Sequence, residues 1–245
     1  MSTLFGLSVS PWSEKTRWAL DYANARYQYQ EFTPMISNLG VRIKSKRYFD
    51  RISVPLLIDG DNVFSDSFSI AKHANTSSKK DSLFPQDKLI EIDYWNRISE
   101  QTLEAGRALV VINMPSSREA CLKSLPAFFP APIKPLMLPV AKSGIFYLKK
   151  KYDVSEKNAQ RYEQIIEENL EILRKALTDS SQYLLGSFTY ADICMAVTLQ
   201  VIKPIQNSHA MLDPATEQCW KNDTLAEKFS DLITWRDSIY QQYRG

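Results

Sequence analysis

The sequence is poor in the residues on which most metal and disulfide chemistry depends. It has 245 residues but only three cysteines and two histidines. Cys121, Cys194 and Cys219 lie far apart without C-x-x-C spacing, which excludes a disulfide scaffold and a thiolate zinc site and fits a reducing compartment. A site of two or three histidines is nearly impossible with His73 and His209 alone, so we expect no bound metal. A histidine-based triad is poorly supported, because His73 falls within a predicted helix and His209 has no nucleophile motif nearby.

Glycine, excess charge and long apolar runs are also scarce. Seven glycines exclude collagen-like and glycine-rich linker sequences. The 30 Lys and Arg nearly balance the 28 Asp and Glu, so the formal charge of +2 supplies no general attraction to phosphate and we expect no nucleic-acid partner. The apolar stretches are shorter than the roughly 18–20 residues that span a bilayer, and the start does not read as a signal peptide. We therefore expect a cytoplasmic protein without a membrane partner.

The first eighty residues alternate short apolar runs with helical patterns. Expected strands cover 3–7, 27–32 and the two arms of a hairpin within 54–64, and expected helices cover 10–23, 65–74 and, less regularly, 39–49. The hairpin is signalled by Asp59-Gly60 between apolar runs. The order βαβαββα predicts a mixed sheet, with a parallel part and an antiparallel edge.

The strand signal disappears from about residue 87. Helical patterns are expected at 90–114, 156–177, 189–201 and 224–240. Six prolines between Pro115 and Pro139 exclude one long helix there, so we expect broken short helices or an ordered loop. A length of 245 residues suits one or two domains. We predict an α/β domain over 1–76, a polar linker over 77–87 and an all-helical domain over 88–245 that contains a proline-rich segment, 115–139.

Three motifs in the first domain could carry chemistry. Ser10-Pro11-Trp12-Ser13 stands where the first strand leads into a helix, where unpaired N–H groups and the helix dipole stabilise an anion. Val54-Pro55 opens a strand, where a cis bond would expose the backbone of Val54 to an extended ligand. Asp66-Ser67 begins a helix and suits an amino-acid end that carries both charges. Each motif also has a structural explanation: helix capping for the first and third, and an ordinary trans proline for the second.

Taken together and in this order, these motifs resemble the glutathione transferase superfamily. The resemblance extends to Phe188-Thr189-x-Ala191-Asp192-Ile193, which has the spacing of a capping box, and covers nearly the whole chain. It implies a thioredoxin-like N-terminal domain and an all-α C-terminal domain. Ser10 matches the activating serine of the serine-type classes, such as the tau-like ones with their S-P-F turn. Thr189 and Asp192 match the family's folding-related capping box, so we assign them a structural role.

The resemblance also implies a glutathione site. Ser10 would hydrogen-bond the glutathione sulfur, and the remaining binding residues would be Val54, Pro55 as the family's cis-proline, Asp66, Ser67 and, as candidates for the glycine carboxylate, Arg42 and Lys44. A hydrophobic acceptor would lie in the cleft between the domains, against Trp12, Arg107, Val111 and Met114. The last three could equally be helix core, since they recur at helical spacing.

The resemblance implies a glutathione transferase that conjugates glutathione, its co-substrate, to hydrophobic electrophiles, as in detoxification, and that forms a homodimer. Two alternatives remain open from the residues. One is an isomerase or peroxidase that uses the same thiolate without forming a stable conjugate. The other is a binding or regulatory protein of the same fold without turnover.

Overall fold

A computed structural model describes the chain over residues 1–33, 37–46, 48–49, 52–76, 78, 80–126, 128–179, 182–207 and 212–244, with the backbone alone at 178 and 179. His209 and positions 77 and 79 of the expected linker lie outside the described residues.

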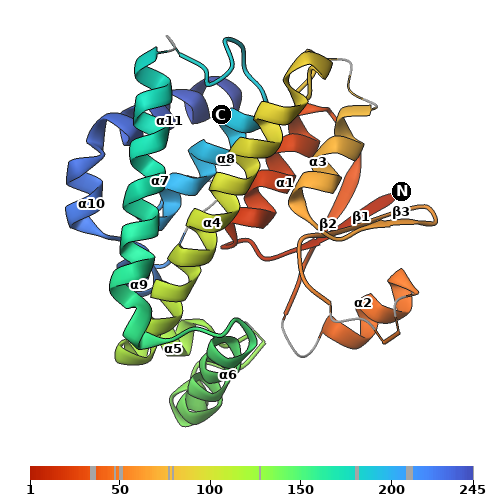
Figure 1. Cartoon of the computed structure of the whole chain (residues 1–245). Coiled ribbons are helices and arrows are strands. Elements are labelled where there is room, and N and C mark those ends of the chain that lie inside the picture. The colour runs from red at the N-terminus through yellow and green to blue at the C-terminus, as the bar shows by residue number, and fades with distance from the viewer. Residues whose placement is uncertain are drawn as a thin grey trace.

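The N-terminal part is a four-stranded mixed sheet with the expected order βαβαββα (Figure 1). Its elements are β1 (Ser2–Gly6), α1 (Pro11–Tyr22), β2 (Tyr27–Glu31), α2 (Ser37–Ser45), β3 (Leu56–Asp59), β4 (Asn62–Phe64) and α3 (Ser67–Thr76). The strands lie in the order β2-β1-β3-β4, with β1 parallel to β2 and the other neighbours antiparallel. The prediction of a thioredoxin-like sheet is therefore confirmed.

Successive side chains of β1 point to opposite faces of the sheet, and their contacts show which helices cover each face. Leu4 is fully buried among Leu20 of α1 and Ile70 of α3, so these two helices cover one face. The next residue, Phe5, packs with Val41 of α2 on the opposite face. This two-sided burial fixes the register of the strands, because a slip of one residue would exchange the two faces.

Among the described residues after α3, the regular elements are all helices, as expected. The α-helices are α4 (Leu89–Asn113), α5 (Arg118–Lys123), α6 (Leu138–Lys151), α7 (Ala159–Asp179), α8 (Tyr190–Thr198), α9 (Pro214–Trp220), α10 (Asp223–Lys228) and α11 (Ser230–Tyr243). Short 3-10 helices cover Gln86–Lys88, Met114–Ser116, Lys134–Met137, Glu156–Asn158 and Leu199–Val201. All nine residues of α8 are buried, which places this helix at the centre of the helical region.

The proline-rich segment is broken into short helices, as predicted, and α6 follows it. The prediction of one helix over 224–240 is wrong. The chain leaves helical geometry at Phe229, whose φ and ψ are −109° and 32°, and divides into α10 and α11. Phe229 is fully buried in the main core, so packing of its ring outweighs the local helical pattern.

One apolar core joins the two halves of the molecule. Trp18 of α1 is fully buried, and its ring centroid lies 4.4 Å from that of Tyr240 in α11. Close contact between α4 and the 3-10 turn at Leu199–Val201 depends on Gly106, because a Cβ there would lie 2.4 Å from the Val201 side chain. Helix α1 is thus held on its inner side by the helical region and on its outer side by the sheet.

Candidate functional site

The register of the sheet brings the three N-terminal motifs to one edge. Phe5, near the end of β1, pairs with Leu56 at the start of β3, and Leu57 pairs with Phe64 at the end of β4. Consequently the loop after β1, the Val54-Pro55 step before β3 and the Asp66-Ser67 turn after β4 all emerge at the same edge. The spacing of these motifs in the sequence does not show that they are close in space. Their proximity results from the antiparallel pairing of β3 with β1.

Ser10 occupies the N-cap position of α1. Its backbone is extended, with φ −88° and ψ 125°, and its carbonyl accepts from the Glu14 N–H at 3.0 Å to close the first turn. Its side chain makes no capping hydrogen bond. The hydroxyl is therefore left available beside the unpaired N–H groups of the helix N-terminus.

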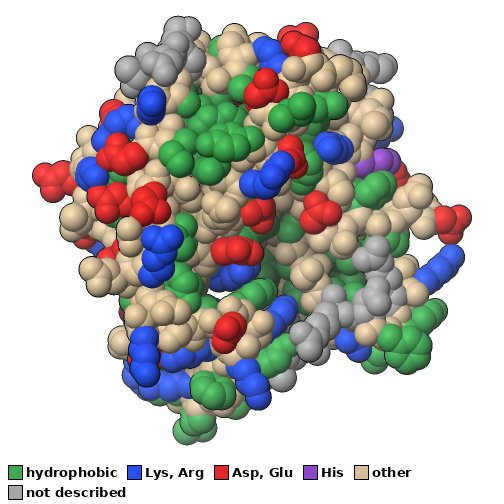
Figure 2. All heavy atoms as spheres, viewed as in Figure 1, with side chains coloured by type: hydrophobic (Ala, Val, Ile, Leu, Met, Phe, Trp, Pro, Cys, Tyr) green, Lys and Arg blue, Asp and Glu red, His purple; other side chains and the backbone are tan. Residues whose placement is uncertain are grey.

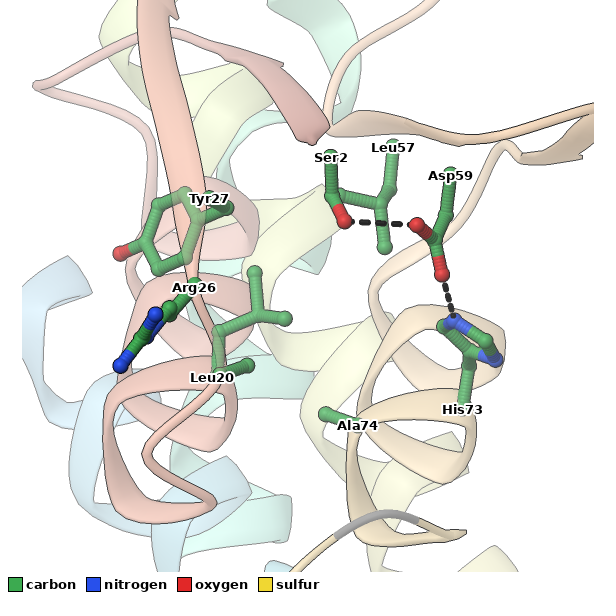
Figure 3. A pocket seen from close by; sticks show the side chains of 9 residues that line it. Ser2, Leu20, Arg26, Tyr27, Leu57, Asp59, His73 and Ala74 are labelled. Atoms are coloured by element: carbon green, nitrogen blue, oxygen red, sulfur yellow. Dashed lines mark hydrogen bonds and ion pairs between the residues drawn. The ribbon is translucent and has the colours of Figure 1, made fainter.

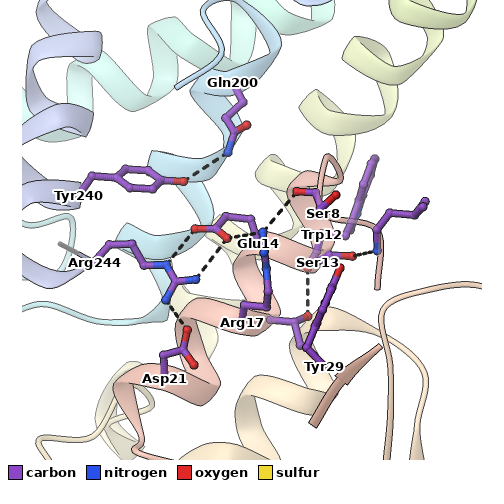
Figure 4. Close-up of polar contacts among 12 residues, drawn as sticks. Ser8, Trp12, Ser13, Glu14, Arg17, Asp21, Tyr29, Gln200, Tyr240 and Arg244 are labelled. Atoms are coloured by element: carbon purple, nitrogen blue, oxygen red, sulfur yellow. Dashed lines mark hydrogen bonds and ion pairs between the residues drawn. The ribbon is translucent and has the colours of Figure 1, made fainter. Parts of the chain in front are cut away.

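Neighbouring side chains hold the loop that precedes Ser10. Ser13, which is fully buried, accepts from the backbone N–H of Leu7 at 3.0 Å. The backbone N–H of Ser8 donates to Glu31 of β2 at 3.0 Å, and the Ser8 carbonyl accepts from Arg17 at 3.3 Å. Figure 4 shows Ser8, Ser13 and Arg17 around the start of α1. The loop geometry thus depends on Ser13 and Ser8, and Ser10 takes no part in it through its side chain.

The other two motifs have the expected local geometry. The Val54-Pro55 bond is cis. Asp66 caps α3, since its carboxylate accepts from the Ser69 N–H at 2.7 Å. Ser67 is 3% exposed, and its carbonyl accepts from the Tyr190 hydroxyl at 3.2 Å, which ties this turn to α8.

The two candidate basic residues of α2 differ in their surroundings. The Lys44 ammonium donates to the Gln30 side chain at 3.2 Å and lies 5.5 Å from the centre of the Phe5 ring. The Nε of Arg42 is buried and has no hydrogen-bond partner among the residues that the structure describes. An unpaired buried donor is costly, so Arg42 is the one of the two whose surroundings call for an anionic partner.

A carboxylate from α4 fixes Trp12. Glu100 accepts from the Trp12 indole N–H at 2.5 Å and, through its other oxygen, from the Lys15 ammonium at 2.5 Å. Lys15 is fully buried, so this ion pair is shielded from solvent on one side. The tryptophan next to Ser10 is consequently anchored to the helical region.

Arg107 of α4 is stacked between two aromatic rings. Its guanidinium carbon lies 4.8 Å from the Trp12 ring centre and 3.8 Å from that of Tyr152. The structure thus brings together Trp12 and Arg107 of the four acceptor residues. Val111 is 4% exposed within a core cluster that includes Cys121 and Ile145, and Met114 packs against the same cluster.

A buried ion-pair network lies behind the start of α1 and was not anticipated from sequence (Figure 4). Glu14 pairs with Arg244, which follows α11, at 2.9 Å, and with Arg17 at 2.9 Å. The Glu14 and Arg244 side chains are 1% and 4% exposed. Arg244 also pairs with Asp21. Nothing local could have identified this pairing, because 230 positions separate Glu14 from Arg244.

The Thr189–Asp192 capping box is present at the start of α8. Asp192 accepts from the backbone N–H groups of Thr189 at 2.8 Å and of Leu184 at 2.9 Å. Burial raises the pKa of Asp192 to about 6, although these hydrogen bonds favour the ionised form. The box is enclosed in the core and therefore stabilises the fold.

A small cavity of about 120 Å³ lies at the other end of the sheet (Figure 3). Asp59 accepts there from the Ser2 hydroxyl at 2.7 Å and contacts the His73 ring nitrogen at 2.8 Å. These two hydrogen bonds hold the pKa of Asp59 below its usual value. Since Ser2 begins β1 and the loop to Ser10 follows its end, this cavity is separate from the Ser10 edge.

The described part of the chain shows neither an exposed cysteine nor a cluster of potential metal ligands. Cys121, Cys194 and Cys219 are free and buried, and burial raises the pKa of Cys194 to about 12, which keeps that thiol neutral. No group of three or more potential ligands among His, Cys, Asp and Glu was found within the described ranges. Among the described helices, none has the length and apolar character needed to cross a bilayer.

Comparison with known proteins agrees with this geometry. Residues 4–79 match the family model of the glutathione S-transferase N-terminal domain. No curated protein sequence shows significant similarity to the chain. Three solved structures align with 98% of the chain: a glutathione S-transferase from Methylobacillus flagellatus with glutathione bound (14% identity, TM-score 0.63, 95% of that chain), glutathione S-transferase I from maize with an atrazine glutathione conjugate (15%, 0.61, 92%) and the beta-etherase LigF from Sphingobium sp. strain SYK-6 (17%, 0.59, 94%). The chain therefore has the fold of the glutathione transferases, and its residues 4–79 match their N-terminal domain.

Proposed function

We propose that the chain binds glutathione at the edge of the sheet where Ser10, Val54-Pro55 and Asp66-Ser67 meet, and transfers it to a hydrophobic electrophile. The observation that carries this proposal is the hydroxyl of Ser10, which stands at the N-terminus of α1 without a capping hydrogen bond. A serine that served only as a cap would use its side-chain oxygen to accept from the first turn.

The Ser10 hydroxyl would donate a hydrogen bond to the glutathione sulfur and hold it as a thiolate. A free thiol with a pKa near 8.5 is only about 3% ionised at pH 7, and lowering that pKa by roughly two units requires about 2.7 kcal/mol. One hydroxyl donor to an anion contributes ~1.5–3 kcal/mol and the helix terminus adds ~0.3–1 kcal/mol. No general base is then needed, because the thiol proton leaves to solvent and the thiolate attacks the electrophilic carbon.

The remainder of glutathione would be held by groups at the same edge. The backbone of Val54, which precedes the first paired residue of β3, would pair with the cysteinyl part. Asp66 and Ser67 at the start of α3 would hold the γ-glutamyl end. Arg42 would meet the glycine carboxylate, because its buried Nε lacks a partner within the described part of the chain, whereas Lys44 already donates to Gln30.

The acceptor would lie against Trp12, beside Ser10. Glu100 holds the indole and Arg107 stacks on it, so this wall is rigid before any ligand arrives. Tyr152, on the far side of Arg107, extends the same surface. Val111 and Met114 would support this wall from the core behind it.

The test is a pH titration of glutathione bound to the purified protein, followed by thiolate absorbance, with Ser10→Ala and Ser8→Ala compared. Ser8 is the matched control, since it lies in the same loop and its hydroxyl already bonds Glu31. We expect a bound thiol that titrates well below free glutathione in the wild type and in Ser8→Ala. In Ser10→Ala the shift should shrink and conjugation should fall about tenfold or more.

Two results would reassign the function. Glutathione bound with an unshifted thiol would support a ligand carrier, and a shifted thiol without a stable conjugate would support an isomerase or a peroxidase. An unchanged rate in Ser10→Ala would exclude Ser10 as the activating residue.

A further inference from the structure

The segment from Ala120 to Tyr152 has a charge pattern unlike the rest of the chain. It contains none of the 28 acidic residues and six lysines: Lys123, Lys134, Lys142, Lys149, Lys150 and Lys151. Because the whole chain carries only +2, the remaining residues are net acidic. The near-neutral net charge of the whole chain therefore results from a basic segment and an acidic remainder.

Helix α6, within this segment, carries apolar side chains both on the face that packs on the core and on its outer face. Its inner face packs through Ala141 and Ile145 against Cys121 and Leu125 of the neighbouring core. Its outer face also carries large apolar side chains: Val140, Phe146 and Tyr147 are 52%, 68% and 55% exposed. The segment before α6 adds Phe128, Ile133 and Leu136, which are 62%, 40% and 79% exposed. We call these six residues the α6 patch.

Lysines flank the α6 patch. Lys142, Phe146 and Lys150 are spaced by four residues, so they lie on one face of the helix. Lys142 and Lys150, together with Lys123 and Lys134, form no ion pair with any described residue, whereas Lys149 pairs with Glu156 at 2.5 Å. Figure 2 shows hydrophobic and basic side chains gathered at the lower end of the molecule, where α6 lies in Figure 1.

A group of exposed apolar side chains flanked by charged residues marks an interaction site, and the sign of the charge indicates the kind of partner. A second copy that met the patch face to face would bring Lys142 and Lys150, which have no ion pair with any described residue, against the same lysines of its partner. A partner with negatively charged groups at its surface and an apolar layer below them would match both the lysines and the exposed apolar side chains. Basic residues around an amphipathic helix face are the features with which proteins bind the interface of an anionic bilayer.

We propose that the α6 patch and its lysines dock the protein on the surface of an anionic phospholipid bilayer. Phe146, Tyr147 and Val140 enter the boundary between headgroups and acyl chains, and the lysines contact the headgroups. Docking is peripheral, since α6 has 14 residues and its inner face stays packed on the core. This reverses the expectation, drawn from overall composition, that no membrane takes part.

The test is sedimentation of the full chain with vesicles, one set of neutral phosphatidylcholine and one with added phosphatidylserine. Each lysine near an anionic surface strengthens binding about fivefold. We expect sedimentation with the anionic vesicles alone, reduced by high salt. Phe146→Ser/Lys150→Glu should weaken it at least tenfold, whereas the matched control Ile172→Ser/Lys175→Glu on α7, whose apolar residue is 39% exposed, should not.

The outcomes separate this proposal from its rivals. Three results would overturn the proposal. The wild type could sediment equally with both vesicle types, it could sediment with neither, or the Phe146→Ser/Lys150→Glu variant could bind vesicles as strongly as the wild type. If that variant instead changed the mass of the protein in sedimentation velocity without lipid, the patch would be a contact between copies. Near-ultraviolet circular dichroism that is unchanged from the wild type establishes that the variants fold. Glutathione binding by the same variants is measured separately, so that a failure of the membrane proposal can be distinguished from a failure of the proposed function.

Discussion

Helix α1 carries two sets of polar groups that differ in whether their side chains have hydrogen-bond or ion-pair partners. On its inner side, Glu14 and Lys15 are buried and fully engaged by partners from α4 and from the end of the chain. At its N-terminus, Ser10 keeps a hydroxyl without a capping partner. The buried set holds the helix in place, and the N-terminal end retains a hydrogen-bonding group that our proposal assigns to glutathione. The proposed site would thus combine a rigid frame with an unsatisfied group at one point.

The largest effect should come from breaking the buried frame with Arg244→Ala. Removal of one partner of a buried ion pair typically costs about 3–5 kcal/mol, because the other charge stays buried. Glu14 would keep Arg17, so we expect a loss of about 3 kcal/mol in the free energy of unfolding, measured with denaturant. The control is Arg97→Ala, whose pair with Asp93 is 71% and 39% exposed and should contribute less than about 1 kcal/mol. Equal losses in both variants would contradict the role of Arg244.

A second large effect should appear in the pH dependence of stability through Asp192. Its folded pKa of about 6 lies above the ordinary 3.8, so the folded state binds the proton more tightly between these values. The resulting stabilisation is present below about pH 4 and is lost as the pH rises through 6, by about 3 kcal/mol. Unfolding of Asp192→Asn should lack this decline relative to the wild type between pH 4 and 7. Parallel stability profiles of the two proteins would refute the raised pKa.

Ser13→Ala should have an intermediate effect. Its hydroxyl oxygen accepts from the Leu7 N–H at 3.0 Å inside the turn, and an orphaned donor costs about 1–3 kcal/mol. We expect a loss of about 1–2 kcal/mol in the free energy of unfolding. A stability equal to that of the wild type would mean that solvent reaches the Leu7 N–H and replaces the serine.

Ser10→Ala should change stability least, by less than about 0.5 kcal/mol, because the side chain makes no capping hydrogen bond. The same change should reduce conjugation about tenfold or more. Ser10 and Ser13 are three positions apart. Ser10 would then act on the ligand, whereas Ser13 would stabilise the fold. A stability loss of 1 kcal/mol or more in Ser10→Ala would favour the capping explanation instead.

Sequence patterns were most informative where the relevant interactions are local. The βαβαββα order follows from alternation and helical spacing within short windows, and the Thr189–Asp192 box depends on two residues that are three positions apart. Local pattern was misleading at Phe229, where a continuous helical periodicity is interrupted because the ring is buried in the core. The candidate site motifs were found through a family resemblance, since each motif taken alone is also an ordinary cap or turn.

The sequence by itself determined the element order, the local caps and a basic segment without acidic residues, because each depends on neighbours within a few positions. Only the tertiary structure decided which charges are buried and which residues share a site. The pairs Glu14–Arg244, Lys15–Glu100 and Arg107–Tyr152 join elements far apart in the chain. It likewise decided that the outer face of α6 stays uncovered. The physical reason is that burial and long-range pairing depend on how the elements pack together, which spacing along one element does not encode.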